Sequence, residues 1–147
     1  MFNVRVYGLL INEKNEILLS DEIIRGNFYT KFPGGGMEFG EGTIECLKRE
    51  FKEELQIDVE VLRHFYTTDY YQRSYFNPND QIISIYYCVS CNESFDLQQI
   101  NSEQDRSEQF RFIHLSDFSE DNVSLPIDKT VARLLVENGR KKNKKSS

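Results

Sequence analysis

The order of apolar and polar residues along the chain predicts strands and two helices. Aliphatic and aromatic runs of strand length, bounded by polar turn residues, predict strands at 4–11, 16–24, 59–71, 81–90 and 109–115. Helical spacing of apolar residues predicts one helix with Thr43 as its N-cap and a second at 128–138 that Gly139 ends. Proline and three glycines predict that 28–36 is a loop. This order favours an α/β (α+β) fold in which helices cover both faces of a mixed sheet.

The length and composition predict a single domain. A chain of 147 residues that is 39% hydrophobic is long enough to bury its own core, and it contains no repeat or linker. We expect the domain to span 1–139, followed by a disordered basic tail at 140–147. No apolar run approaches the roughly twenty residues that span a membrane, and the N-terminus lacks the features of a signal peptide. An odd number of cysteines (Cys46, Cys88 and Cys91) then predicts reduced thiols in a cytoplasm.

Charge restricts the partners of this domain. The net charge is −6, and residues 140–145 carry five of the 18 lysines and arginines, so the remainder of the chain is still more acidic. Such a surface repels nucleic-acid phosphates, which argues against general binding of DNA or RNA. A phosphate compound would need a divalent cation or local hydrogen-bond donors.

Three glutamates share one side of the first predicted helix. Glu50, Glu53 and Glu54 lie three and four positions apart, where like charges cost a few tenths of a kcal/mol each. On the other side, an apolar stripe is formed by Ile44, Leu47, Phe51 and Leu55. Clustered carboxylates are the hard oxygen ligands that suit Mg²⁺ or Mn²⁺. A solvated acidic face is the alternative that charge spacing alone leaves open.

A glycine-rich segment precedes the helix and favours a ligand. Gly34, Gly35 and Gly36 allow a ligand to approach the backbone closely, and Glu41 stands between two further glycines just before the helix. A glycine-rich turn that leads into a helix N-terminus favours anions. The two features together predict a phosphate held through metal to carboxylates.

The residues from Gly35 through Glu41 to "REFKEELQI" (Arg49–Ile57) resemble the Nudix box of the Nudix hydrolases. The preceding "FPGG" and Glu38 are also similar to that family's approach to the box. Gln56 departs from the pattern, because the family usually has glycine there, and Phe51 is bulkier than the usual aliphatic residue. Because "QIDVEV" already reads as the entry to a strand, we predict that the helix ends without a left-handed residue at Gln56.

The resemblance implies an α/β/α sandwich and a metal-dependent hydrolase of nucleoside diphosphates linked to another group, with Mg²⁺ or Mn²⁺ as cofactor. It implies that the metal ligands are Glu50, Glu53 and Glu54. It further implies that Arg49 orients a catalytic glutamate, that Glu41 braces the box, and that Gly35 admits substrate phosphate or metal.

The general base remains open at this point. A carboxylate must take the proton of the attacking water, and Glu53 or Glu54 is suitable for this. An acidic residue from the later segment 101–110 is also suitable, and the candidates there are Glu103, Asp105 and Glu108.

The substrate is less well defined by the sequence. Gly34, Gly35 and Gly36 are the candidates for contacting phosphate. Tyr71 and Arg73, in the aromatic segment 70–76, are candidates for stacking on a base and holding a phosphate. Most of these aromatic residues are expected in the core instead, and both histidines are expected to be structural.

Two rival functions and one question of assembly stay open. A catalytically silent Nudix-like domain would sense a nucleotide or bind a partner, but a pure sensor needs fewer carboxylates around phosphate. An acidic scaffold without a ligand would leave the three consecutive glycines unexplained. The expected partner is a small nucleotide-type molecule and no membrane, and a homodimer is compatible with the sequence.

Overall fold

The computed structural model describes residues 1–103 and 107–145, with side chains described as far as Lys141. Two sheets carry the strands. The first has the order β4-β1-β6-β5, and the second has the order β3-β2-β7. The strands are β1 (Phe2–Leu10), β2 (Glu16–Ile24), β3 (Asn27–Lys31), β4 (Gly34–Gly36), β5 (Glu60–Thr67), β6 (Gln81–Ser90) and β7 (Glu108–His114). The helices are α1 (Thr43–Leu55), α2 (Leu97–Ser102) and α3 (Pro126–Lys145), with short 3₁₀ turns η1 (Leu115–Asp117) and η2 (Glu120–Asn122).

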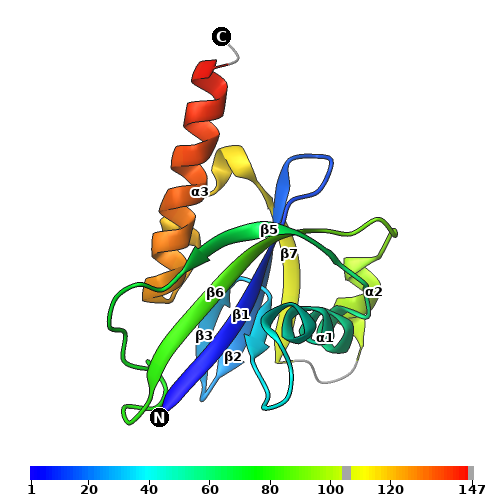
Figure 1. Ribbon diagram of the computed structural model, residues 1–147. Coiled ribbons are helices and arrows are strands. Elements are labelled where there is room, and N and C mark those ends of the chain that lie inside the picture. The colour runs from blue at the N-terminus through cyan, green and yellow to red at the C-terminus, as the bar shows by residue number, and fades with distance from the viewer. Residues whose placement is uncertain (104–106, 146–147) are drawn as a thin grey trace.

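The helices lie on two sides of the sheets (Figure 1), with α1 and α2 on one side and α3 on the other. Alternation along β1 explains this arrangement, because neighbouring side chains of a strand point to opposite faces. Val6 and Leu10 pack with α1, whereas Tyr7 and Leu9 pack in the core that α3 covers. The pairing of β1 with β6 is parallel and the other pairings are antiparallel, so the four-stranded sheet is mixed. The predicted α/β/α sandwich with a mixed sheet is confirmed.

The predicted loop at 28–36 is wrong. Residues Asn27–Lys31 form β3 and Gly34–Gly36 form β4, which pairs with β1. Pro33 lies between the two strands, where its carbonyl accepts a hydrogen bond from the N–H of Gly8 at 2.9 Å. Glycine disfavours a strand because it offers no side chain to pack. Here the missing side chains allow β4 to lie against β1, since a Cβ on Gly34 would come 2.1 Å from the carbonyl oxygen of Val6.

The helix boundaries also differ from the prediction. The N-cap of α1 is Gly42 and not Thr43, whose hydroxyl instead shares a hydrogen bond with Tyr87. Ile44 is exposed, and the buried stripe of α1 includes Cys46 in its place. The last helix does not end at Gly139 but continues to Lys145, through most of the predicted tail, of which 146–147 lie outside the described residues. The short helix α2 was not predicted.

None of the three cysteines, all of which lie in the described part of the chain, forms a disulfide bond. Within the described part of the chain, no helix is both long and apolar enough to cross a membrane.

The end of α1 contradicts the prediction for Gln56. This residue caps the helix with φ 58° and ψ 30°, which is the left-handed conformation, and its N–H donates to the carbonyl of Lys52. A residue with a Cβ adopts this conformation at a cost of about 1 kcal/mol relative to glycine.

We therefore expect Gln56→Gly to raise the free energy of unfolding by about 0.5–1 kcal/mol, measured by denaturant unfolding. Gln56→Asn should give a smaller gain, because asparagine tolerates the left-handed region better than glutamine does. A lower stability for the glycine variant would show that the freedom it adds to the unfolded chain outweighs the relieved strain.

Candidate active site

Helix α1 presents its carboxylates along the edge of its buried stripe. The side chain of Glu50 is 13% exposed and that of Glu53 is 58% exposed. Glu54, one turn after Glu50, turns towards the sheets and is partly buried. Two of the three glutamates therefore face the interior, and Glu53 lies at the surface.

Arg49 joins the glycine-rich loop to α1. Its Nε and Nη2 donate to the two carboxylate oxygens of Glu41 at 2.9 and 2.7 Å, and Nη2 also donates to the carbonyl of Gly36 at 3.0 Å. Its Nη1 donates to Glu50 at 3.0 Å and to Glu53 at 3.2 Å. These hydrogen bonds hold the pKa of Glu41 at about 2, well below its usual range. All three nitrogens of the Arg49 guanidinium are thus engaged by the box itself.

Glu54 has a buried oxygen that the protein leaves unpaired. Its Oε2 has no hydrogen-bond partner among the described residues. Its pKa is raised to about 9, chiefly by burial and next by the negative charge of Glu108, whereas the positive charge of Lys31 opposes the rise. Buried polar atoms in folded proteins are nearly always paired, so an unpaired carboxylate oxygen at this place indicates a site for a ligand.

A buried lysine supplies positive charge beside this carboxylate. The Nζ of Lys31 lies 3.2 Å from Glu22 and 3.3 Å from Glu108, and its side chain is 7% exposed. Ser20 donates a second hydrogen bond to Glu108. Cross-strand pairing explains the cluster, because β2 pairs with both β3 and β7 and so brings these side chains to one place.

Glycine is needed at position 35 because a side chain there would clash with Glu50. A Cβ on Gly35 would lie 2.6 Å from the carboxyl carbon of Glu50, closer than such atoms approach. Its φ is not in the left-handed region, so the reason for glycine here is the carboxylate that lies against its backbone.

The donor set fits a divalent cation. Glu50 and Glu54 provide hard oxygen atoms, and the orphaned Oε2 of Glu54 is the kind of atom that such an ion would satisfy. Among the described residues, however, the acidic side chains do not converge as a group of three at metal-binding distances, because Glu50 and Glu53 are turned towards Arg49. The assignment of Glu50, Glu53 and Glu54 as metal ligands stays a prediction.

The candidate bases from the segment 101–110 do not all lie at the same place. Glu108 lies beside Glu54 and Lys31 at the start of β7. Glu103 is exposed and lies at the C-terminal end of α1, where it accepts a long hydrogen bond from Gln56. Asp105 lies outside the described residues.

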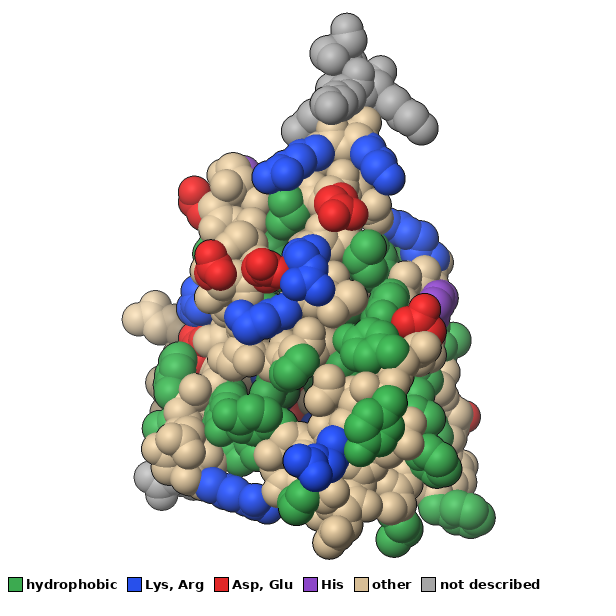
Figure 2. Space-filling model, turned by 90° about the vertical axis from the view of Figure 1, so that its left-hand side faces the viewer, with side chains coloured by type: hydrophobic (Ala, Val, Ile, Leu, Met, Phe, Trp, Pro, Cys, Tyr) green, Lys and Arg blue, Asp and Glu red, His purple; other side chains and the backbone are tan. Residues whose placement is uncertain are grey.

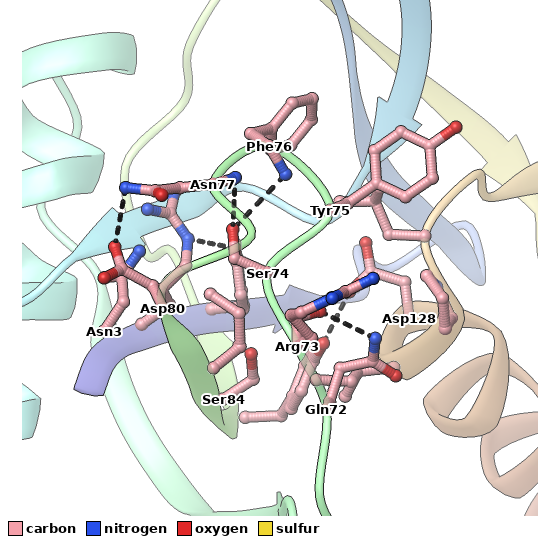
Figure 3. Close-up of a pocket in the computed structure, with 17 residues that line it drawn as sticks. Asn3, Gln72, Arg73, Ser74, Tyr75, Phe76, Asn77, Asp80, Ser84 and Asp128 are labelled. Atoms are coloured by element: carbon pink, nitrogen blue, oxygen red, sulfur yellow. Dashed lines mark hydrogen bonds between the residues drawn. The ribbon is translucent and has the colours of Figure 1, made fainter. Parts of the chain in front are cut away.

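A cavity of about 270 Å³ (Figure 3) is lined in part by Arg5 and Tyr7, which pair with Gly36 and Gly34 of β4. The segment 72–77 forms one wall, the N-terminus of α3 with Asp128 forms another, and side chains of β1 and β6 complete the lining. Figure 2 shows hydrophobic side chains gathered on this side of the molecule, below the part of α3 that carries lysines and arginines. Such a concave, mostly apolar site is typical of small-molecule binding.

The two predicted substrate contacts in the segment 70–76, Tyr71 and Arg73, lie at different places. Arg73 lines the cavity, but the structure does not bring Tyr71 to it. Tyr71 is 68% exposed and borders a different hollow with Met1 and Phe2, because the chain has already left β5 at Thr67.

Asp128 is the buried acid of the cavity. Its Oδ1 accepts a hydrogen bond from the Tyr86 hydroxyl at 2.5 Å, and its Oδ2 is buried without a hydrogen-bond partner among the described residues. Burial raises its pKa to about 6.

Sequence reasoning missed Arg5, Lys31 and Asp128. Each belongs to a strand or helix that packing brings to the site, and none is part of the motif. The one signal was the position of Lys31, which stands directly before "FPGG" in a stretch otherwise rich in aromatic residues.

Comparisons with known proteins identify the family and the fold of this chain. The model of the NUDIX domain matches residues 1–134. The fold is similar to that of a MutT protein from Methanosarcina mazei Go1, with a TM-score of 0.67 and 21% identity, covering 97% of this chain and 96% of that one. It is also similar to a MutT protein from Bacillus halodurans, with a TM-score of 0.69 and 16% identity over 91% and 82% of the two chains. A UDP-X diphosphatase matches with a TM-score of 0.60 and 17% identity over 93% of this chain and 60% of that one.

At these identities the solved structures show a shared fold. Among proteins with curated descriptions, none matches the chain. Because the domain model covers most of the sequence, the chain belongs to the NUDIX domain family. The predicted resemblance to the Nudix box is confirmed.

Proposed function

We propose that this protein hydrolyses the pyrophosphate bond of a nucleoside diphosphate linked to another group, and that it needs Mg²⁺ or Mn²⁺. The observation that carries the proposal is the buried, unpaired Oε2 of Glu54. Glu54 lies beside Glu50, and the carboxylate of Glu50 lies against Gly35 of β4. MutT proteins and a UDP-X diphosphatase among the similar structures support a substrate of this kind.

The carboxylates of Glu50, Glu53 and Glu54 would hold the cation. When bound, a divalent ion neutralises charge on the phosphate oxygens and lowers the pKa of a bound water. Arg49 positions Glu50 and Glu53 through its Nη1 and fixes the loop through Glu41. The backbone of Gly35, bare of a side chain, leaves the carboxylate of Glu50 room beside the strand.

Glu108 is the base that the geometry favours. Its carboxylate lies close to Glu54 and accepts hydrogen bonds from Lys31 and Ser20, which fix its position. Glu53 is mostly exposed and engaged with Arg49, and Glu54 is suited to binding the cation. A carboxylate held by a buried lysine at the edge of the box is suited to accept a proton from water.

The proposal also includes the setting of the enzyme. Reduced thiols and a small nucleotide-type substrate suit a cytoplasm.

The test is a panel of nucleoside diphosphate derivatives and triphosphates with Mg²⁺ or Mn²⁺, in which released phosphate or pyrophosphate is measured. We expect at least one compound to be hydrolysed, and EDTA to abolish the turnover. The cation should also raise the melting temperature as its concentration increases, because an ion that binds only the folded state stabilises it by mass action.

Full turnover in excess EDTA would contradict the proposed metal dependence. Tight binding of a nucleotide without turnover would instead support the catalytically silent alternative.

A further inference from the structure

Arg5 links the cavity to the box. On β1 it pairs with Gly36 of β4, and its Nη1 lies 3.5 Å from the position that a Cβ on Gly36 would occupy. The same side chain lines the cavity with Tyr7 and Asp128. Its charge also interacts with Glu50 of the box. The guanidinium therefore lies where a molecule that extends from the cavity to the metal-binding carboxylates must pass.

Most hydrogen-bonding capacity of Arg5 is unused. Its Nε donates to the Tyr7 hydroxyl at 2.6 Å, and its Cζ lies 5.7 Å from the centre of the Tyr7 ring, so the guanidinium is held in place. Within the described part of the chain, Nη1 and Nη2 donate no hydrogen bond. Arg49, by contrast, uses all three of its nitrogens on the box. A half-buried guanidinium with two free nitrogens presents the planar pair of donors that matches phosphate oxygens.

The cavity limits what is attached to that phosphate. Its volume of about 270 Å³ holds one ring system of nucleoside size. Its far wall offers the unpaired Oδ2 of buried Asp128, which requires a hydrogen-bond donor. Tyr75 and Phe76 line the cavity and provide flat apolar surface for a ring.

We propose that Arg5 binds the phosphate next to the group that enters the cavity, and so determines which end of the substrate lies there and which end points to the box. The group in the cavity is a nitrogen-containing ring whose N–H faces Asp128. This proposal rests on the proposed function, because it assigns an orientation to the same substrate.

The test uses nucleoside 5′-monophosphates and the corresponding nucleosides as probes, titrated by calorimetry in the presence of Mg²⁺. A monophosphate has no anhydride bond, so it binds without turnover. We expect at least one monophosphate to bind the wild type about tenfold or more tightly than its nucleoside. Arg5→Gln should remove most of this difference while leaving nucleoside affinity nearly unchanged. Arg5→Lys, which keeps the charge, should restore part of it. Arg63→Gln, at an exposed position of β5, serves as the matched control and should have no effect.

A measurement without any substitution covers the case in which Arg5→Gln does not fold. The NMR signal of the Arg5 Nε–H should shift when the monophosphate is added. A monophosphate that binds Arg5→Gln as tightly as it binds the wild type would overturn the proposal, and so would the absence of binding by every monophosphate, or an unmoved Arg5 signal. Loss of phosphate affinity in Arg5→Gln without hydrolysis of any compound would refute the proposed function alone.

Discussion

Glu54→Gln is expected to lower kcat by about a hundredfold or more while the protein keeps its fold. Glutamine preserves size and helix propensity but replaces a charged metal ligand by a neutral amide. In the absence of metal the variant should be at least as stable as the wild type, because the native side chain buries an unpaired carboxylate oxygen. The stabilisation by Mn²⁺ should disappear with the activity. Steady-state kinetics and thermal melting with and without Mn²⁺ measure both effects.

Glu45→Gln is the control for this experiment. Glu45 lies on the same helix, and its side chain accepts a hydrogen bond from the N–H of Gly42, which glutamine can also accept. We expect it to change kcat by less than about twofold. Equal losses in both variants would indicate a general effect on α1. A Glu54→Gln enzyme that retained its rate and its response to Mn²⁺ would exclude Glu54 as a ligand.

Gly35→Ala should lower activity strongly in a protein that still folds. A Cβ there meets the Glu50 carboxylate at 2.6–2.7 Å, so that side chain must move away from the strand. Because Arg49 and Glu54 are arranged around Glu50, the displacement reaches the whole box. We expect kcat to fall about tenfold or more and the free energy of unfolding to fall by about 1–3 kcal/mol.

The neighbouring glycines provide matched controls. At Gly36 the nearest atom to an added Cβ is 3.5 Å away, so Gly36→Ala should be tolerated. At Gly34 the φ is 146° and the added Cβ would lie 2.1 Å from the backbone oxygen of Val6, so Gly34→Ala should fail to fold. A Gly35→Ala enzyme with normal kcat would show that Glu50 can shift without consequence.

Much of the fold could be read from the sequence because hydrophobic alternation is a local signal. The runs at 16–24 and 81–90 match β2 and β6 residue for residue. The strands β3 and β4 could not be predicted, because their stability comes from pairing with β2 and β1 and the glycines of β4 give no local preference for a strand. The prediction for Gln56 was wrong for a similar reason. Local propensity gave no sign that the end of α1 would hold this residue in a left-handed conformation.

The residues of the candidate site also fall into those that the sequence could predict and those that it could not. The box is contiguous in sequence, so its spacing made the glutamates candidate ligands, and its resemblance to the Nudix box made Arg49 a candidate. Lys31 and Arg5 come from β3 and β1, and only sheet pairing places them beside the glutamates. The sequence suggested that the positive charge near the glutamates comes from outside the protein. The structure shows that Lys31 already supplies part of it.

The position of α3 as the last element has a consequence for synthesis on the ribosome. The carboxylate cluster is complete once β7 has been made, because Glu108 is its last member in the chain. The wall of the cavity that contains Asp128 belongs to α3, which docks through Ile127, Val131 and Ala132. Since chains are made from the N-terminus, a nascent chain stopped near residue 120 would possess every acid of the reaction centre but only part of the chamber beside it. Under the proposed function, the groups proposed for hydrolysis are therefore synthesised before the wall of the cavity proposed to select the substrate.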